Sequence, residues 1–147
     1  MTASTVFWTV FAGVAVFVVG QIVVKFFLEP IQEWYKLRGE IGHSLIFYAN
    51  VYSNTQACDD SVIREANGTF RRLSCELFAK VSTIPLYSLW SFLHLLPTRS
   101  NIEKAGGYLI GLSNGCLDKS EYGTDRNDQR RRKLEALLEL NTGTTTE

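Results

Sequence analysis

Residues 6–28 of the chain read VFWTVFAGVAVFVVGQIVVKFFL, an almost unbroken apolar run. The chain has 15 basic and 15 acidic residues, and none of them precedes Lys25. A helix rises about 1.5 Å per residue, so roughly 20 residues cover the hydrocarbon thickness of a bilayer. The run is long enough to span, and the sequence predicts a transmembrane anchor over residues 1–28.

An N-terminal apolar run can also be a signal peptide. A signal peptide has a basic start, an apolar stretch of about 7–15 residues and small residues before the cleavage site. Here residues 1–5 carry no basic side chain, the apolar run is longer, and Val18-Val19-Gly20 is only a weak cleavage site. These features favour a retained anchor.

Aromatic residues stand at both ends of the predicted anchor. Trp8 lies near its start, and Trp34 and Tyr35 follow its end. The two tryptophans are separated by about 39 Å of helix, close to the membrane thickness with headgroups included. Aromatic side chains with a polar group favour both membrane interfaces, so we expect these three residues to mark them.

Basic residues near the anchor indicate its direction. Lys25, Lys36 and Arg38 lie on its C-terminal side, and no basic residue lies on the other. The positive-inside rule then places the N-terminus outside and the rest of the chain in the cytoplasm. The expected location is the inner membrane of the cell, crossed once.

The anchor carries a polar stripe and two glycines. Residues at four-residue intervals share one face of a helix, and four polar side chains follow this spacing: Gln21, Lys25, Glu29 and Glu33. Gln21 could bond a neighbouring span for about 1 kcal/mol, but we favour the alternative in which Gln21 and Lys25 simply reach the headgroups. Gly13 and Gly20 are two turns apart and could permit close approach of another helix, but no GxxxG motif occurs. Pro30 should kink or restart the helix.

The remaining sequence predicts an all-α fold in which the anchor is followed by a small antiparallel bundle of about four to five helices. Apolar residues recur at intervals of three and four, as on one face of a helix. This helical cytoplasmic domain covers residues 29–140, and residues 141–147 form a disordered tail. The expected helices cover residues 31–53, 60–81, 84–96, 100–115 and 124–140. The apolar stripe expected in the second of them consists of Val62, Ile63, Ala66, Phe70, Leu73, Leu77 and Val81.

Residues 84–96 are a second apolar block, too short to cross a bilayer. Leu86, Leu89, Trp90 and Leu93 lie on one face, opposite a more polar face with Tyr87, Ser88, Ser91 and His94. The block is interpreted as the central helix of the bundle. The alternative is a helix lying in the membrane interface with Trp90 as its anchor, but no Lys or Arg borders its polar face, as such helices usually require.

Sequence signals also predict where the last two helices begin and how one of them packs. Ser100 and Glu103 have the spacing of a capping box, and Thr124 or Asp125 can cap the final helix. Three glycines in the first of these helices indicate close packing against a neighbour: Gly106, Gly107 and Gly111.

A basic run in the last helix has two interpretations. Arg130, Arg131, Arg132 and Lys133 could contact anionic lipid. Acidic residues flank the run, however, and a solvated amphipathic helix is the favoured interpretation.

No motif in the sequence specifies a reaction, a metal site or a cofactor. The net charge is zero, which argues against general nucleic-acid binding. Cys58, Cys75 and Cys116 match no zinc spacing and are interpreted as reduced, mostly buried thiols. Glu40 and His43 have the spacing of a di-iron motif, but two histidines are too few for such a site.

Several short segments together resemble a group of small bacterial proteins with one N-terminal span and a helical cytoplasmic part. They are Gly20-Gln21, Lys25-Phe26, residues 29–33, residues 39–41, residues 47–50 and residues 112–114. The resemblance covers mainly the first 55 residues. It implies a bacterial inner membrane and an anchor followed by a bundle, and it implies no activity.

Three functions follow as hypotheses. The first is a non-enzymatic membrane-anchored helical module that binds a protein partner or forms a homo-oligomer, with the lipid bilayer as its other partner. The second is a membrane-perturbing effector in which Gln21 and Lys25 line an assembly of spans. The third is an enzyme acting on a membrane substrate, with His43 or His94 as its base.

Overall fold

The computed structural model describes residues 3–118, 120 and 122–140, and every regular element in these ranges is helical. The elements are α1 (Ala3–Val23), a π-helical turn (Val24–Leu28), α2 (Glu29–Phe47), α3 (Ala49–Ser53), a 3₁₀ turn (Thr55–Ala57), α4 (Asp60–Thr83), α5 (Tyr87–Phe92), α6 (Arg99–Gly115) and α7 (Gly123–Leu138). The predicted all-α class is confirmed. The predicted tail at residues 141–147 lies outside the described residues.

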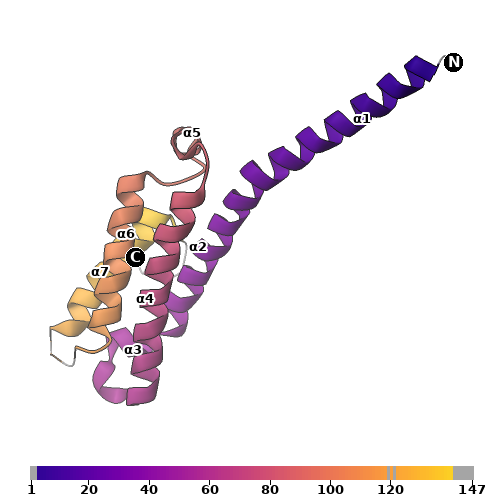
Figure 1. Ribbon diagram of the computed structural model, residues 1–147. Helices are drawn as coiled ribbons and strands as arrows, with labels where there is room; N and C mark the ends of the chain where they lie inside the picture. Colours follow the sequence, from indigo (N-terminus) through magenta and orange to yellow (C-terminus); the bar gives the residue numbers. More distant parts are fainter. Residues whose placement is uncertain (1–2, 119, 121, 141–147) are drawn as a thin grey trace.

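The four long helices α2, α4, α6 and α7 pack into a bundle from which α1 projects (Figure 1). Hydrogen bonds between neighbouring helices show the direction in which each helix runs relative to the next. Three of them join α2 and α4, α4 and α6, and α6 and α7 respectively: Arg72 to Glu40 at 2.6 Å, Ser113 Oγ to the Asn67 carbonyl at 2.9 Å, and Arg130 to the Gly111 carbonyl at 3.0 Å. The same opposed order holds elsewhere, since Tyr48 bonds Glu65, Ser74 bonds the Gly106 carbonyl and Gly115 packs on Asn127, so successive long helices are antiparallel.

The junction between α1 and α2 is one widened helical turn. The Glu29 N–H bonds the Val24 carbonyl, five residues back, instead of the usual four. Pro30 lacks an N–H and would collide with the Phe26 carbonyl in a regular helix. The wider turn before it relieves this conflict. Of the two outcomes predicted at Pro30, a kink or a restart, a restart does not occur, because the helix continues through the widened turn and Pro30 lies in the first turn of α2.

The core lies where the long helices bury one stripe each. The fully buried large side chains are Trp34, Leu37, Ile41, Leu45, Phe70, Leu73, Leu77, Ile102, Leu109, Leu112, Leu134 and Leu138. The stripe predicted for residues 60–81 is confirmed except at Val62, which is exposed. The helix predicted over residues 31–53 is broken at Tyr48 (φ −96°, ψ 18°). The short helix α3 then turns back toward α7.

Glycines permit the closest helix contacts, as the sequence predicts for α6. A Cβ placed on Gly106 would lie 2.4 Å from the Phe78 ring, and one on Gly111 would lie 2.9 Å from Arg130 Nε. A Cβ on Gly115 would lie 1.9 Å from Asn127 Oδ1. Gly107 is different, since no described atom lies within 4 Å of its Cβ position.

Two predicted caps are wrong. The cap of α6 is Thr98, whose hydroxyl accepts a bond from the Asn101 N–H at 3.3 Å, so Ser100 lies inside the helix. The α7 helix begins at Gly123, before Thr124 can cap it. The Thr124 hydroxyl instead donates to the Ser53 carbonyl at 3.0 Å and ties α7 to α3.

Candidate functional site

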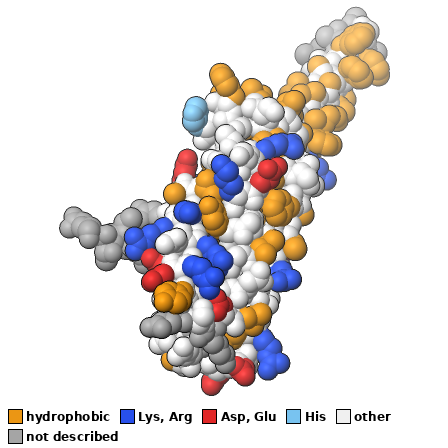
Figure 2. All heavy atoms as spheres, turned by 90° about the vertical axis from the view of Figure 1, so that its left-hand side faces the viewer, with side chains coloured by type: hydrophobic (Ala, Val, Ile, Leu, Met, Phe, Trp, Pro, Cys, Tyr) orange, Lys and Arg blue, Asp and Glu red, His pale blue; other side chains and the backbone are white. Residues whose placement is uncertain are grey.

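The surface of α1 is the first candidate site, because it is apolar and lies outside the bundle (Figure 2). The described side chains of this helix are exposed, including Trp8 at 65% and Val16 at 74%. Within the described residues, one helix is long and apolar enough to cross a membrane, and α1 forms its N-terminal part. A contiguous exposed apolar surface of this kind marks a place where lipid or protein binds.

Two positions of the predicted span contact have room for a second helix. At Gly13 and Gly20, no described atom lies within 4 Å of the Cβ position. Gln21 is exposed on the same uncovered helix. The side of α1 that carries Gly13, Gly20 and Gln21 is thus uncovered and accessible to a partner.

The two aromatic residues predicted for the inner interface, Trp34 and Tyr35, differ in their exposure. Trp34 is 1% exposed and lies in the bundle core, so the prediction that it contacts headgroups is wrong. Its side chain belongs to the hydrophobic core cluster, and burial of the ring outweighs its preference for an interface. Tyr35, one position on, is exposed, and its hydroxyl lies 3.4 Å from the Leu95 carbonyl.

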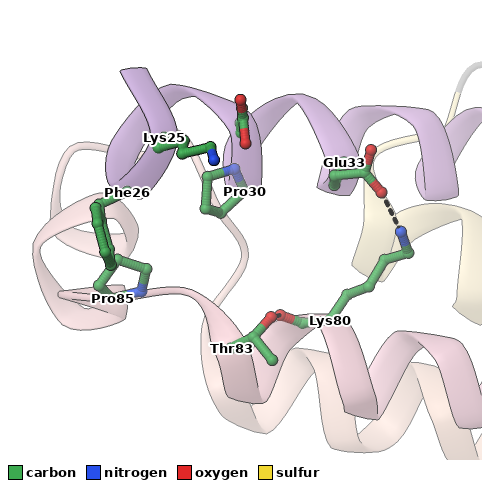
Figure 3. Close-up of a pocket in the computed structure, with 8 residues that line it drawn as sticks. Lys25, Phe26, Pro30, Glu33, Lys80, Thr83 and Pro85 are labelled. Carbon is green, nitrogen blue, oxygen red and sulfur yellow. Dashed lines mark hydrogen bonds and ion pairs between the residues drawn. The ribbon is translucent and has the colours of Figure 1, made fainter. Parts of the chain in front are cut away.

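A groove lies where α1 gives way to α2, opposite the end of α4 (Figure 3). Its volume is about 490 Å³, and its lining residues are Lys25, Phe26, Glu29, Pro30, Glu33, Lys80, Thr83 and Pro85. Three members of the predicted polar stripe therefore meet at one groove. Gln21, the fourth, is one turn further along α1 and does not line it.

The groove holds charges of both signs. Glu33 accepts hydrogen bonds from Lys80 across the groove and from Lys36 at 3.4 Å on its own helix (Figure 3). Lys25 and Glu29 form no ion pair within the described part of the chain. The groove can thus receive a polar group that carries both a positive and a negative charge.

The segment over residues 84–96 is the second exposed apolar surface. The structure contradicts its interpretation as the central helix, since only Tyr87–Phe92 is helical. Leu86 and His94 bracket this short helix in the left-handed conformation, with φ of 52° and 58°. Such backbone costs on the order of 1–3 kcal/mol per residue, so packing elsewhere must hold it.

The two predicted faces of this segment do not match the exposure of its side chains. Tyr87, assigned to the polar face, is buried, whereas most of the apolar residues point outward. Five of the outward residues are more than 40% exposed: Leu86, Leu89, Phe92, Leu93 and Leu95. Ser88 and His94 of the predicted polar face are also exposed, and Trp90 of the predicted apolar face is partly buried against the core, so spacing alone did not identify the side chains that the bundle covers.

Specific contacts hold the segment in this orientation. Ile84 and Leu96 are buried at its two ends. The Tyr87 hydroxyl donates to the Pro97 carbonyl at 2.5 Å, and the Trp90 indole donates to the Pro85 carbonyl at 3.2 Å. These bonds close the segment into a compact loop with its apolar side chains outside.

Basic side chains border this loop, although sequence reasoning found none. The Arg99 guanidinium lies 5.2 Å from the centre of the Tyr87 ring, and Lys25 lines the groove together with Pro85. Lys25 is 60 residues away in sequence, so only the fold reveals it. Arg99 follows the block closely and was the available signal.

The basic run of α7 is largely engaged within the protein. Arg130 donates to the Gly111 carbonyl and to Asn127 Oδ1, both at 3.0 Å. Arg131 is 12% exposed and bonds Asp128 at 2.8 Å and Glu135 at 3.0 Å. The anionic-lipid interpretation is therefore wrong for Arg130 and Arg131.

The other two members of the run lie outward. Arg132 pairs with Asp128 at 2.9 Å, and the Lys133 ammonium lies 5.9 Å from the Tyr108 ring. Their predicted contact with lipid stays a prediction.

Residues considered for catalysis lie apart. His43 stacks on Phe47 with ring centres 5.7 Å apart, and Glu40 pairs with Arg72 instead of turning to His43. His94 is exposed in the loop described above. Among the described residues, no group of three or more His, Cys, Asp or Glu side chains could hold a metal ion.

The three cysteines differ in exposure. Cys116 is buried, and burial raises the pKa of its thiol to about 12. Cys58 is partly buried, whereas Cys75 is exposed on α4, contrary to the interpretation of mostly buried thiols. Cys75 is thus the most accessible thiol in the folded bundle.

No protein-family model, curated protein or solved structure matches the chain. The resemblance to small bacterial membrane proteins stays a prediction. Function has to be argued from the geometry of the chain itself.

Proposed function

We propose that the chain is a single-pass membrane protein whose helical bundle serves as an interaction module, with a second copy of the chain as its first partner. The observation that carries the proposal is the surface of α1. Its residues are predominantly apolar, and the bundle buries none of the window that could cross a membrane. Lipid and another span are the two environments that cover such a helix without leaving apolar surface in water.

A second copy is favoured by the stripe that contains Gly13, Gly20 and Gln21. These positions are seven and eight residues apart and share one side of α1. Small residues let two helix backbones approach, which is how packing holds spans together in lipid. A Gln side chain near such a contact can add an interhelical hydrogen bond of about 1 kcal/mol.

The proposed orientation places the N-terminus outside and the bundle in the cytoplasm, with the anchor in the inner membrane of the cell. Lys25, Lys36 and Arg38 follow the apolar run. Basic residues close to the ends of a span are the ones that set orientation.

Self-association is tested with the full chain in lipid vesicles, by energy transfer between donor-labelled and acceptor-labelled copies. Gly13→Leu and Gly20→Leu should each reduce transfer strongly, because the larger side chain separates the helices. Ala15→Leu is the matched control, since Ala15 lies on the opposite side of α1. Transfer that is absent in the unaltered chain, or equal in all three variants, would contradict the proposal.

Orientation is tested in intact cells with a maleimide that cannot cross membranes. Cys75 should react only after the cells are permeabilised, because it is exposed on the bundle. A Ser4→Cys substitution should react in intact cells. The reverse pattern would show that the bundle lies outside.

A further inference from the structure

We infer that the loop over residues 84–96 is a second membrane contact, which embeds its apolar side chains in the leaflet from which α1 emerges. This inference rests on the proposed function in one respect, namely that α1 spans the bilayer. It adds a lipid-binding surface on the bundle itself and fixes how the bundle stands on the membrane.

The outer surface of the loop is formed by large apolar side chains. Leu86, Leu89, Phe92, Leu93 and Leu95 project from ten residues of chain, and Phe92 is 78% exposed. Single exposed apolar residues are ordinary on a soluble protein, but a cluster of five large ones marks a binding surface.

The loop lies beside the π-helical turn that follows α1. The Phe27 and Trp90 rings lie edge to face with their centres 6.2 Å apart. Pro85 and Phe26 line the same groove (Figure 3). The loop therefore stands beside the last apolar turn of the span, where hydrocarbon gives way to headgroups.

Hydrogen bonds and buried ends hold the loop in the form in which its apolar side chains face outward. Its buried ends and the bonds of Tyr87 and Trp90 fix the loop, as described above. Leu86 and His94 keep left-handed backbone angles. A surface that is already ordered loses little conformational freedom on binding.

The surroundings of the loop favour lipid over a protein partner. The loop continues the apolar surface of α1 through the Phe27–Trp90 contact. Lys25 and Arg99 border it and can meet lipid phosphates, which an interfacial segment usually requires. A bilayer that covers α1 down to Phe27 reaches the loop without any change in the fold.

The inference is tested with spin labels on the full chain, in a background without native cysteines (Cys58→Ser, Cys75→Ser, Cys116→Ala). One label replaces Phe92, and a matched label replaces Phe47, which is exposed at the other end of the bundle. Vesicles of phosphatidylcholine and phosphatidylglycerol supply the bilayer. Collision rates with oxygen and with a water-soluble nickel chelate report depth.

The label at position 92 should collide more with oxygen and several-fold less with nickel than the label at position 47. Equal nickel collision rates at the two positions would overturn the inference. A label at Leu89 provides an independent second site in the loop. Phe92 and Leu89 are both exposed, so replacing either one does not disturb the core. Helical circular dichroism is recorded for each labelled chain.

Alkaline carbonate extraction of the same vesicles separates this inference from the proposed function. If the chain stays with the vesicles while position 92 is accessible to nickel, the span stands and the second contact is wrong. If the chain is extracted, the proposed membrane anchor fails as well.

Discussion

Helices α1 and α4 are similar in length, with 21 and 24 residues, but they use apolar side chains in opposite ways. In α4 the buried residues form one stripe: Ile63, Ala66, Phe70, Leu73, Ser74, Leu77 and Val81. In α1 apolar side chains occur all round, and the bundle buries none of the window that could cross a membrane. A stripe indicates a helix that packs on protein, whereas a uniformly apolar helix indicates a different solvent.

The short helix α5 belongs with α1 in this comparison, although it is too short to span. Its apolar residues are exposed while Tyr87 is buried, the reverse of what a core helix shows. Proximity to Phe27 places it at the same end of the molecule. The direction in which apolar residues point thus separates the core from two surfaces that lipid can cover.

The largest expected effect is a loss of bundle stability when a core side chain of α4 is truncated. Phe70→Ala removes a fully buried ring and should lower the free energy of unfolding of the bundle by about 3–5 kcal/mol. Phe11→Ala, on the exposed surface of α1, should change it by less than about 0.5 kcal/mol. Urea denaturation in detergent measures both. Similar losses in the two variants would mean that α1 packs on the bundle.

For insertion into the membrane, a substitution in α1 should have a large effect, and a substitution on the bundle surface should have none. Phe17→Arg places a charge near the middle of the span and should cost about 2.5–3.5 kcal/mol of insertion free energy. Ile46→Arg, on the exposed surface of α2, should leave membrane retention unchanged. The fraction of chain retained after carbonate extraction is the measurement. A fully retained Phe17→Arg variant would argue that α1 does not cross the bilayer.

Glycine substitutions separate crowded from open helix surfaces. Gly115→Ala should destabilise the bundle by about 1–3 kcal/mol, because the added Cβ would collide with Asn127 Oδ1. Asn127 cannot move freely, since its amide donates to the Tyr52 carbonyl at 3.0 Å. Gly107→Ala in the same helix and Gly20→Ala in α1 should not destabilise it. Thermal unfolding by circular dichroism compares the three, and a stable Gly115→Ala variant would contradict the packing of α6 on α7.

The smallest expected effect concerns charge on α7. A hydrogen bond from Arg131 holds the pKa of Asp128 below its usual value. Stability from this ionised carboxylate is present above the unfolded pKa of about 4 and is lost as the pH falls through the lower folded pKa. Asp128→Asn should thus cost at most about 1 kcal/mol at neutral pH and nothing in strong acid.

Urea denaturation at several pH values measures this difference, and Asp125→Asn is the control, since Asp125 is exposed on the same helix. A difference between Asp128→Asn and the unaltered chain that is the same at neutral and acid pH would rule out the charge as its cause.

The sequence predicted the helices and their apolar stripes because a helix's own residues determine that pattern. Ile63, Phe70 and Leu77 were identified as core from spacing alone. Trp34 and Tyr87 were misassigned, since which face of a helix is covered depends on neighbours that are distant in sequence. The groove was only partly predictable: the stripe from Lys25 to Glu33 was visible, but Lys80 and Pro85 reach it through the fold.

The most direct test of the proposal that α1 lies in lipid is the depth of Ala15, on the side of α1 opposite Gly13. A spin label at Ala15→Cys in the cysteine-free chain is compared with the label at position 47 in the same vesicles. We expect frequent collisions with oxygen and very few with the nickel chelate at position 15. Nickel collisions as frequent as those at position 47 would contradict the membrane span and, with it, the proposed function.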